Sequence, residues 1–225
     1  AWVAGLFSGQ KLDSQTLAAF GATCIDHSAA TACFHANQKA MGAGATSFRR
    51  LVSAFHDISK KLGPEEIRET DNYLKFLVEE LKPFIDKTYS TKTDASNTFV
   101  AGSSMGGLIS LYALCGYPNV FGGAACLSTH WPGLMSMENN PVPAVFFSYL
   151  KQHLPSPKQH KIYFDHGTET LDAMYASLQV QVDAIMKQKK YSNSQWISRS
   201  WPGQDHSEKS WRSRLDVPVT FLLKN

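Results

Sequence analysis

Apolar and polar residues follow two periodicities along this chain, one typical of helices and one typical of buried strands. The segment from residue 48 to residue 62 carries an apolar stripe at spacings of three and four and ends at Gly63-Pro64, which predicts a helix. A second apolar stripe covers residues 74–85, and Thr70 or Asp71 is a suitable N-cap for it. Pro83 lies inside this second helix, so we expect the helix to bend or to end its regular part there.

Short apolar runs follow these helices and alternate with further helical segments. We expect strands at residues 98–101, 121–127, 161–164 and 195–200, with helices at 108–115 and 171–186. Strands that alternate with helices predict a mostly parallel sheet with helices on both faces, which is a three-layer α/β sandwich. With no repeat and no linker-like segment, the simplest interpretation is a single domain over residues 1–225.

Composition narrows the class of protein. The chain has 225 residues, 43% of them hydrophobic and 18% charged, with a formal net charge of +3, so we expect a soluble globular protein without nucleic acid as a partner. No apolar run approaches the roughly 20 residues of a membrane span. The sequence does not distinguish a cytoplasmic protein from an exported one, nor does it indicate an oligomeric state.

The four cysteines show no spacing typical of a metal or redox site. Cys115 and Cys126 lie in apolar segments, so we expect them to be small buried hydrophobic residues. Whether Cys24 and Cys33 pair depends on the compartment, and the sequence leaves this open.

The turn after the strand at 98–101 contains the pattern G-x-S-x-G centred on Ser104. A nucleophile elbow needs this pattern between a strand and a helix, because the turn is so tight that larger side chains two residues before and after the serine would collide with backbone. The backbone amide of Met105 would begin the next helix and is placed to stabilise an oxyanion. A structural glycine turn is the alternative interpretation.

A serine needs a base, and in this fold the acid and the histidine follow it in that order. His206 follows the last predicted strand and is the candidate base. Three carboxylates lie near the end of the strand at 161–164: Asp165, Glu169 and Asp172. We favour Asp172 and keep Glu169 as an alternative, because Asp165 lies within or beside the strand; a cap for the next helix, or a serine–histidine dyad, also stays open. His130 and Trp131 follow the strand at 121–127 and are candidates for lining a substrate pocket.

Residues from about 73 to the carboxyl end resemble the bacterial esterases of the esterase D and enterochelin esterase superfamily, which are related to feruloyl esterases and mycolyl transferases. The resemblance is carried by residues 74–86, 101–110, 117–123, 127–131, 167–172 and 205–211. It implies an α/β-hydrolase fold, a catalytic Ser104 and a catalytic His206, and a triad acid in the segment with Glu169 and Asp172. The first 70 residues diverge from the family or are trimmed, and residues 7–13 are the best match to its oxyanion loop, which makes Gln10 the second amide donor.

These observations predict a serine esterase that hydrolyses a small-molecule carboxylic ester through an acyl-enzyme on Ser104. Neither a metal nor an organic cofactor is expected. Two alternatives stay open: an acyltransferase that uses an alcohol acceptor, and a degenerate hydrolase scaffold that binds a ligand without turnover.

Overall fold

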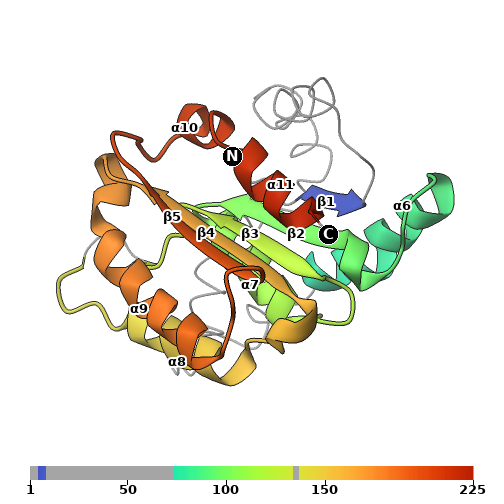
Figure 1. Cartoon of the computed structure of the whole chain (residues 1–225), viewed down its shortest axis with the longest axis horizontal. Coiled ribbons are helices and arrows are strands. Elements are labelled where there is room, and N and C mark those ends of the chain that lie inside the picture. Colours follow the sequence, from blue (N-terminus) through green and yellow to red (C-terminus); the bar gives the residue numbers. More distant parts are fainter. Residues whose placement is uncertain (1–4, 9–72, 134–136, 225) are drawn as a thin grey trace.

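A parallel sheet forms the centre of the protein. The computed structural model describes residues 5–8, 73–133 and 137–224. The sheet that it describes has five strands: β1 (Gly5–Ser8), β2 (Thr98–Ser103), β3 (Gly123–Leu127), β4 (Lys161–Gly167) and β5 (Trp196–Trp201). They are ordered β1-β2-β3-β4-β5, with β2 to β5 parallel and β1 antiparallel to β2 (Figure 1).

Successive residues of the central strands face opposite sides of the sheet. On β2, Val100 contributes to one hydrophobic cluster, while Phe99 and Ala101 contribute to another. On β3, Ala124 and Cys126 belong to the first cluster. Because both faces are buried, these strands have continuous apolar runs rather than alternation of apolar and polar residues.

Helices cover both faces of the sheet. The described chain has these helical segments: η2 (Phe76–Leu81), α6 (Lys82–Thr88), η3 (Ala95–Asn97), α7 (Met105–Gly116), α8 (Val142–His153), η4 (Pro157–Gln159), η5 (Thr170–Met174), α9 (Ala176–Gln188), α10 (Glu208–Arg212) and α11 (Asp216–Leu223). Helices α7, α8 and α9 pack in the first cluster, and α11 packs in the second (Figure 1). The expected α/β sandwich of three layers is therefore confirmed.

The helix around Pro83 shows how the chain accommodates a proline. Just before it, η2 has π-helical hydrogen bonding, and the N–H of Lys82 donates to the carbonyl oxygen of Leu77 five residues earlier. Pro83 then lies in the first turn of α6, where its missing N–H costs little. The expected bend is thus a change of helical type. The helix expected at residues 48–62 lies outside the described residues.

The sequence analysis did not anticipate three helices, α8, α10 and α11. In α8, Val142, Phe146 and Leu150 recur four residues apart and are buried. This spacing in the sequence is typical of a helix and could have predicted α8. Helices α10 and α11 are short, and their burial depends on the sheet face they cover. The helix expected at 171–186 begins as η5 and becomes regular only at Ala176.

Cys115 and Cys126 are free thiols, half-buried and buried respectively, while Cys24 and Cys33 lie outside the described residues. The expectation of one domain over residues 1–225 stays a prediction for the same reason. Within the part of the chain described, no helix combines the length and the apolar character needed to cross a bilayer.

Candidate active site

The parallel register brings the candidate residues to one edge of the sheet. Ser103 at the end of β2 pairs with Leu127 at the end of β3, and Leu127 pairs with Asp165 in β4. The ladder continues beyond the strands, because the N–H of Ser104 donates to Leu127 O (2.8 Å) and that of Ser128 donates to Asp165 O (2.8 Å). Residues that follow β2, β3 and β4 therefore lie side by side at the carboxyl ends, where open α/β sheets bind ligands.

Ser104 occupies a strained turn between β2 and α7. Its φ of 57° and ψ of −118° lie outside the regions that a residue with a side chain prefers. A Cβ on Gly102 would lie 2.3 Å from the carbonyl oxygen of Gly106, whereas a Cβ on Gly106 would meet nothing within 4 Å. The requirement for a small residue therefore falls on Gly102, not equally on both glycines as the motif suggested.

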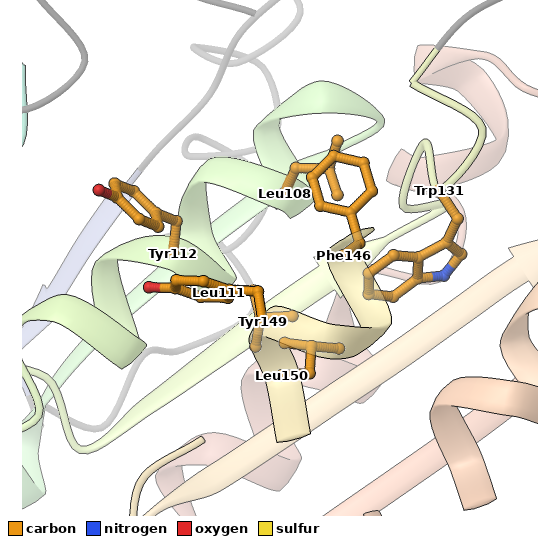
Figure 2. Close-up of a pocket in the computed structure, with 7 residues that line it drawn as sticks. All are labelled: Leu108, Leu111, Tyr112, Trp131, Phe146, Tyr149 and Leu150. Atoms are coloured by element: carbon orange, nitrogen blue, oxygen red, sulfur yellow. The ribbon is translucent and has the colours of Figure 1, made fainter. Parts of the chain in front are cut away.

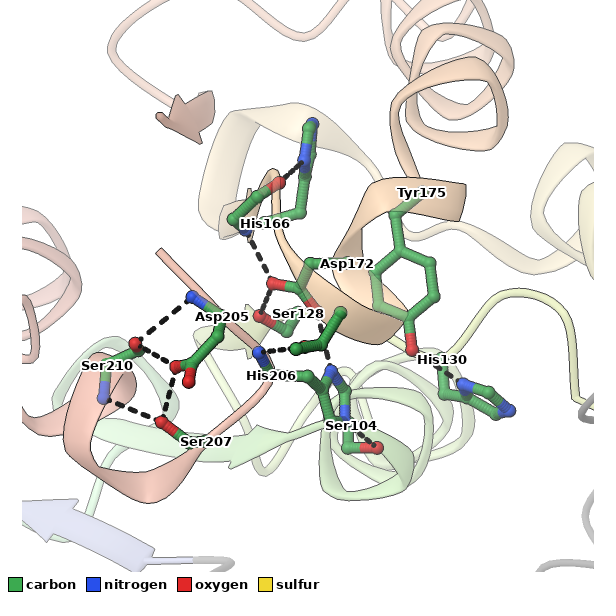
Figure 3. Close-up of polar contacts among 12 residues, drawn as sticks. Ser104, Ser128, His130, His166, Asp172, Tyr175, Asp205, His206, Ser207 and Ser210 are labelled. Atoms are coloured by element: carbon green, nitrogen blue, oxygen red, sulfur yellow. Dashed lines mark hydrogen bonds and ion pairs between the residues drawn. The ribbon is translucent and has the colours of Figure 1, made fainter. Parts of the chain in front are cut away.

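Ser104, His206 and Asp172 form a continuous chain of hydrogen bonds (Figure 3). The Nε2 atom of His206 lies 2.9 Å from Ser104 Oγ. The Nδ1 atom of the same ring lies 2.6 Å from Asp172 Oδ1. These contacts join the three residues that the motif and the chain order put forward as candidate nucleophile, base and acid, and the three residues come from separate segments of the chain.

The segments that carry Asp172 and His206 are joined to each other by backbone hydrogen bonds and by the side chain of Thr170. The N–H groups of Thr168 and Glu169 both donate to Gln204 O, and the His206 N–H donates to Thr170 Oγ1 at 2.9 Å. A Cβ on Gly167 would lie 2.1 Å from Gln204 O, so only glycine permits this approach. These contacts hold the segment of Asp172 against the segment of His206.

Asp172 is held as an acceptor at both carboxylate oxygens. Its Oδ2 accepts from Ser128 Oγ and from the N–H of Gly167, each at 2.5 Å, while Oδ1 faces His206. Burial raises the pKa of this fully buried carboxyl, but hydrogen bonds from His206, Ser128 and Gly167 outweigh burial and hold the pKa below its usual value. The environment favours an ionised Asp172.

The other two candidate acids lie elsewhere. Glu169 is exposed, and its carboxylate accepts from the hydroxyl of its neighbour Thr168 at 3.2 Å. Asp165 lies within β4, as expected, and pairs with Arg214 through Nε at 3.0 Å and Nη2 at 3.1 Å. Among the three carboxylates considered, Asp172 is the one whose oxygen lies at His206.

Aromatic rings restrain the imidazole of His206. Trp211 and Tyr175 both meet it edge-on, with ring centroids 4.9 Å and 5.7 Å away. Tyr175 OH also lies 2.6 Å from Nδ1 of His130, a buried residue whose N–H donates to Ser104 O at 3.2 Å. His130 thus lies beside the nucleophile turn.

Trp131 points into the core instead. Its side chain is 1% exposed, and its indole N–H donates to Gln179 Oε1 at 3.0 Å. With residues of α7 and α8 it lines a small apolar cavity, to which Leu108 and Phe146 also contribute (Figure 2). Ser104, Asp172 and His206 do not line this cavity.

The candidate oxyanion donors differ in how they are placed. Met105 is the first residue of α7, so its N–H has no carbonyl partner within the helix and is available to an anion. Gln10 lies outside the described residues. Within the described residues, no group of three or more His, Cys, Asp or Glu side chains is placed to hold a metal ion.

A known protein family matches most of this chain. Residues 54–222 match the model of the family described as "putative esterase", which is most of the chain. The chain belongs to this esterase family. No curated protein sequence matches it.

Solved structures of esterases share the fold of this esterase-family chain. A ferulic acid esterase matches with a TM-score of 0.53 and 18% identity over 68% of this chain and 60% of its own. The enterobactin esterase of Shigella flexneri matches with a TM-score of 0.54 and 23% identity over 68% of this chain and 38% of its own. The ferric enterobactin esterase of Salmonella typhimurium matches with a TM-score of 0.50 and 22% identity over 72% of this chain and 40% of its own. The chain thus spans less than two thirds of each of these proteins.

The sequence analysis missed Ser128, Arg214 and Trp211, whose side chains meet behind Asp172. Ser128 follows β3 as Ser104 follows β2, so its position at the strand end was a usable signal. Nothing local distinguishes Arg214 from the other arginines. Its role depends on α10 folding back over the sheet, which only the tertiary structure shows.

Proposed function

We propose that this esterase-family chain is a serine hydrolase that cleaves small-molecule carboxylic esters through an acyl-enzyme on Ser104. The observation that carries the proposal is the chain of hydrogen bonds from Ser104 through His206 to Asp172. Membership of the esterase family supports ester hydrolysis generally, and the geometry supports this route.

The hydrogen bonds define which nitrogen of His206 carries the proton. An ionised Asp172 can only accept, so the proton lies on Nδ1, and Nε2 presents its lone pair to the Ser104 hydroxyl. His206 is therefore oriented as a general base toward the nucleophile.

In the first step, Ser104 Oγ forms a bond to the ester carbonyl carbon while His206 Nε2 takes the hydroxyl proton. The tetrahedral intermediate then collapses: the bond to the alcohol oxygen breaks, and His206 returns its proton to the leaving alcohol. Water, deprotonated by His206, then attacks the acyl carbon. The bond from that carbon to Ser104 Oγ breaks, His206 returns its proton to Ser104 Oγ, and the carboxylic acid is released. No cofactor takes part in these steps.

The oxyanion of each intermediate needs donors that are already in place. We assign the N–H of Met105 as one donor, because it begins α7 directly after the nucleophile. Gln10 is retained as the second donor on the family resemblance alone. We assign Asp172 as the triad acid rather than Glu169, and we assign Trp131 a packing role, with His130 as the neighbour of the substrate.

The test is labelling and turnover on matched serine variants. A fluorophosphonate probe should label the wild type and the Ser103→Ala control but not Ser104→Ala, and Ser104→Ala should lose at least about 10⁴-fold of kcat on p-nitrophenyl esters of graded chain length. His206→Ala should be similarly inactive. When an alcohol is added, the acyl group should still be released as the free acid; formation of an ester with the added alcohol would favour the acyltransferase. If the probe labels no serine of the wild type, a binding scaffold is favoured and the proposal fails.

A further inference from the structure

Ser128 is a buried serine with no part in the reaction steps above. It is 0% exposed and follows β3 with a φ of 42°, a left-handed conformation that is unfavourable for a residue with a side chain. Strain of this kind persists where the surrounding structure holds it, and it concentrates at functional sites.

The hydroxyl of Ser128 meets three polar groups at once. Trp211 Nε1 and Arg214 Nη2 each lie 2.9 Å from Ser128 Oγ, and Asp172 Oδ2 lies 2.5 Å from it (Figure 3 shows the contact with Asp172). An indole N–H and a guanidinium N–H can only donate. Ser128 Oγ must accept from both, which uses its two lone pairs.

The direction of the remaining bond follows from this count. A serine hydroxyl has one proton, and it cannot point at Trp211 or Arg214 because both of these groups donate. The proton is therefore donated to Asp172 Oδ2. Hydrogen bonds in which one partner is charged are shorter and stronger than neutral ones. The donor-only neighbours thus force Ser128 to bind the ionised form of Asp172.

Arg214 is itself immobilised. Arg214 is 2% exposed, and its guanidinium makes two bonds to Asp165. Asp165 also accepts from the phenol of Tyr163 at 3.0 Å and from the backbone N–H of Ser128 at 3.2 Å. Asp165 therefore holds both Arg214 and the Ser128 backbone. Arg214, which lies between α10 and α11 and donates to the Ser128 hydroxyl, is thus held in place by Asp165 of β4.

We propose that Ser128, oriented by Arg214 and Trp211, is a positioning residue that holds the triad acid Asp172 in place and limits how strongly Asp172 attracts a proton on His206. This inference rests on the proposed role of Asp172. Ser128 does not touch substrate and acts only through the acid.

Removal of the Ser128 hydroxyl should change the pH dependence as well as the rate. Without that donor, Asp172 carries more uncompensated charge and stabilises the protonated form of His206, so the acid limb of kcat/KM moves to higher pH. The titratable groups that face Asp172 in the described structure are His206 and Tyr175. Burial raises the pKa of the Tyr175 phenol, which stays neutral across the range tested.

The first measurement compares Ser128→Ala with Ser110→Ala. Ser110 is equally buried, but its hydroxyl donates to the helical carbonyl of Gly106 at 2.7 Å. We expect Ser128→Ala to lower kcat about 10- to 100-fold with KM changed less than about twofold, and to move the acid limb upward. Ser110→Ala should retain the wild-type profile.

A double-mutant cycle separates positioning from general structural damage. In an Asp172→Asn background, Ser128→Ala should cause no further loss of kcat, because the residue through which it acts is already disabled. A full additional loss in that background would overturn the inference. Trp211→Phe keeps a ring beside His206 but removes one donor to Ser128, so its loss should be smaller than that of Ser128→Ala and of the same sign.

A spectroscopic signal keeps this test independent of the proposed esterase activity. The proton shared between His206 Nδ1 and Asp172 should give a far-downfield ¹H NMR resonance, absent in Asp172→Asn and shifted in Ser128→Ala. If the wild type hydrolyses no ester, the proposed function fails while this resonance still tests Ser128. An unchanged resonance and an unchanged pH profile in a folded Ser128→Ala protein would refute the positioning role.

Discussion

Asp172 and Glu169 are three residues apart and carry the same acidic group, yet their surroundings assign them different properties. Asp172 is fully buried and accepts from His206, Ser128 and Gly167, whereas Glu169 is exposed to solvent. A sequence shows that both carboxylates follow β4. It does not show which one turns inward, because the strained backbone at Thr170, with a φ of 54°, makes that turn.

At the residue scale, we therefore predict opposite outcomes for the two acids. Asp172→Asn should lower kcat by about 10³- to 10⁴-fold, because the amide no longer holds the correct tautomer of His206. Glu169→Gln should stay within about twofold of the wild type. Steady-state kinetics on a p-nitrophenyl ester would measure both, and an inactive Glu169→Gln beside an active Asp172→Asn would reverse our assignment.

At the element scale, the junction of β2 with α7 positions Ser104, the proposed nucleophile. The strand ends at Ser103 and the helix begins at Met105, so the direction of the chain changes within a single residue. That change brings the backbone of Gly106 against Gly102, where no side chain fits. Of the two glycines in the G-x-S-x-G pattern, only Gly102 is therefore required by steric crowding.

Substitution of alanine for glycine tests this junction. Gly102→Ala should lower the free energy of unfolding by about 1–3 kcal/mol and reduce kcat more than about 100-fold, because the added methyl displaces the elbow. Gly116→Ala, at the exposed end of α7 where a Cβ meets nothing within 4 Å, should raise stability by up to about 1 kcal/mol. Urea unfolding monitored by circular dichroism would compare the two, and equal stabilities would contradict the crowding argument.

At the scale of the whole molecule, a buried ion pair connects the sheet with the segment that covers its second face. Asp165 on β4 and Arg214, between α10 and α11, are both almost fully buried. Such a pair is costly to bury but more costly to break, because one partner then remains as an unpaired buried charge.

We expect Asp165→Asn to lower the free energy of unfolding by about 3–5 kcal/mol. The double variant Asp165→Asn/Arg214→Met should regain part of that loss, because neither charge is then left alone. Its esterase rate should nevertheless stay low, since Ser128 loses a donor. Thermal unfolding would measure stability beside kinetics, and full recovery of both would argue against a role for Arg214 in the site.

The sequence alone determined the order of most elements and put forward the three residues of the candidate site that hydrogen bonds join, Ser104, His206 and Asp172. Apolar runs bounded by turns predicted β2 to β5 within a few residues, because a strand leaves its pattern in the adjacent residues of the sequence. The pattern around Ser104 is local in the same way, and the order of residues along the chain then selected His206 and favoured Asp172. The tertiary structure decided the rest. It selected Asp172 over Glu169 as the neighbour of His206 and assembled Ser128, Trp211 and Arg214 behind it. Those contacts join residues up to 86 positions apart, and only the register of a folded sheet brings such distant positions together.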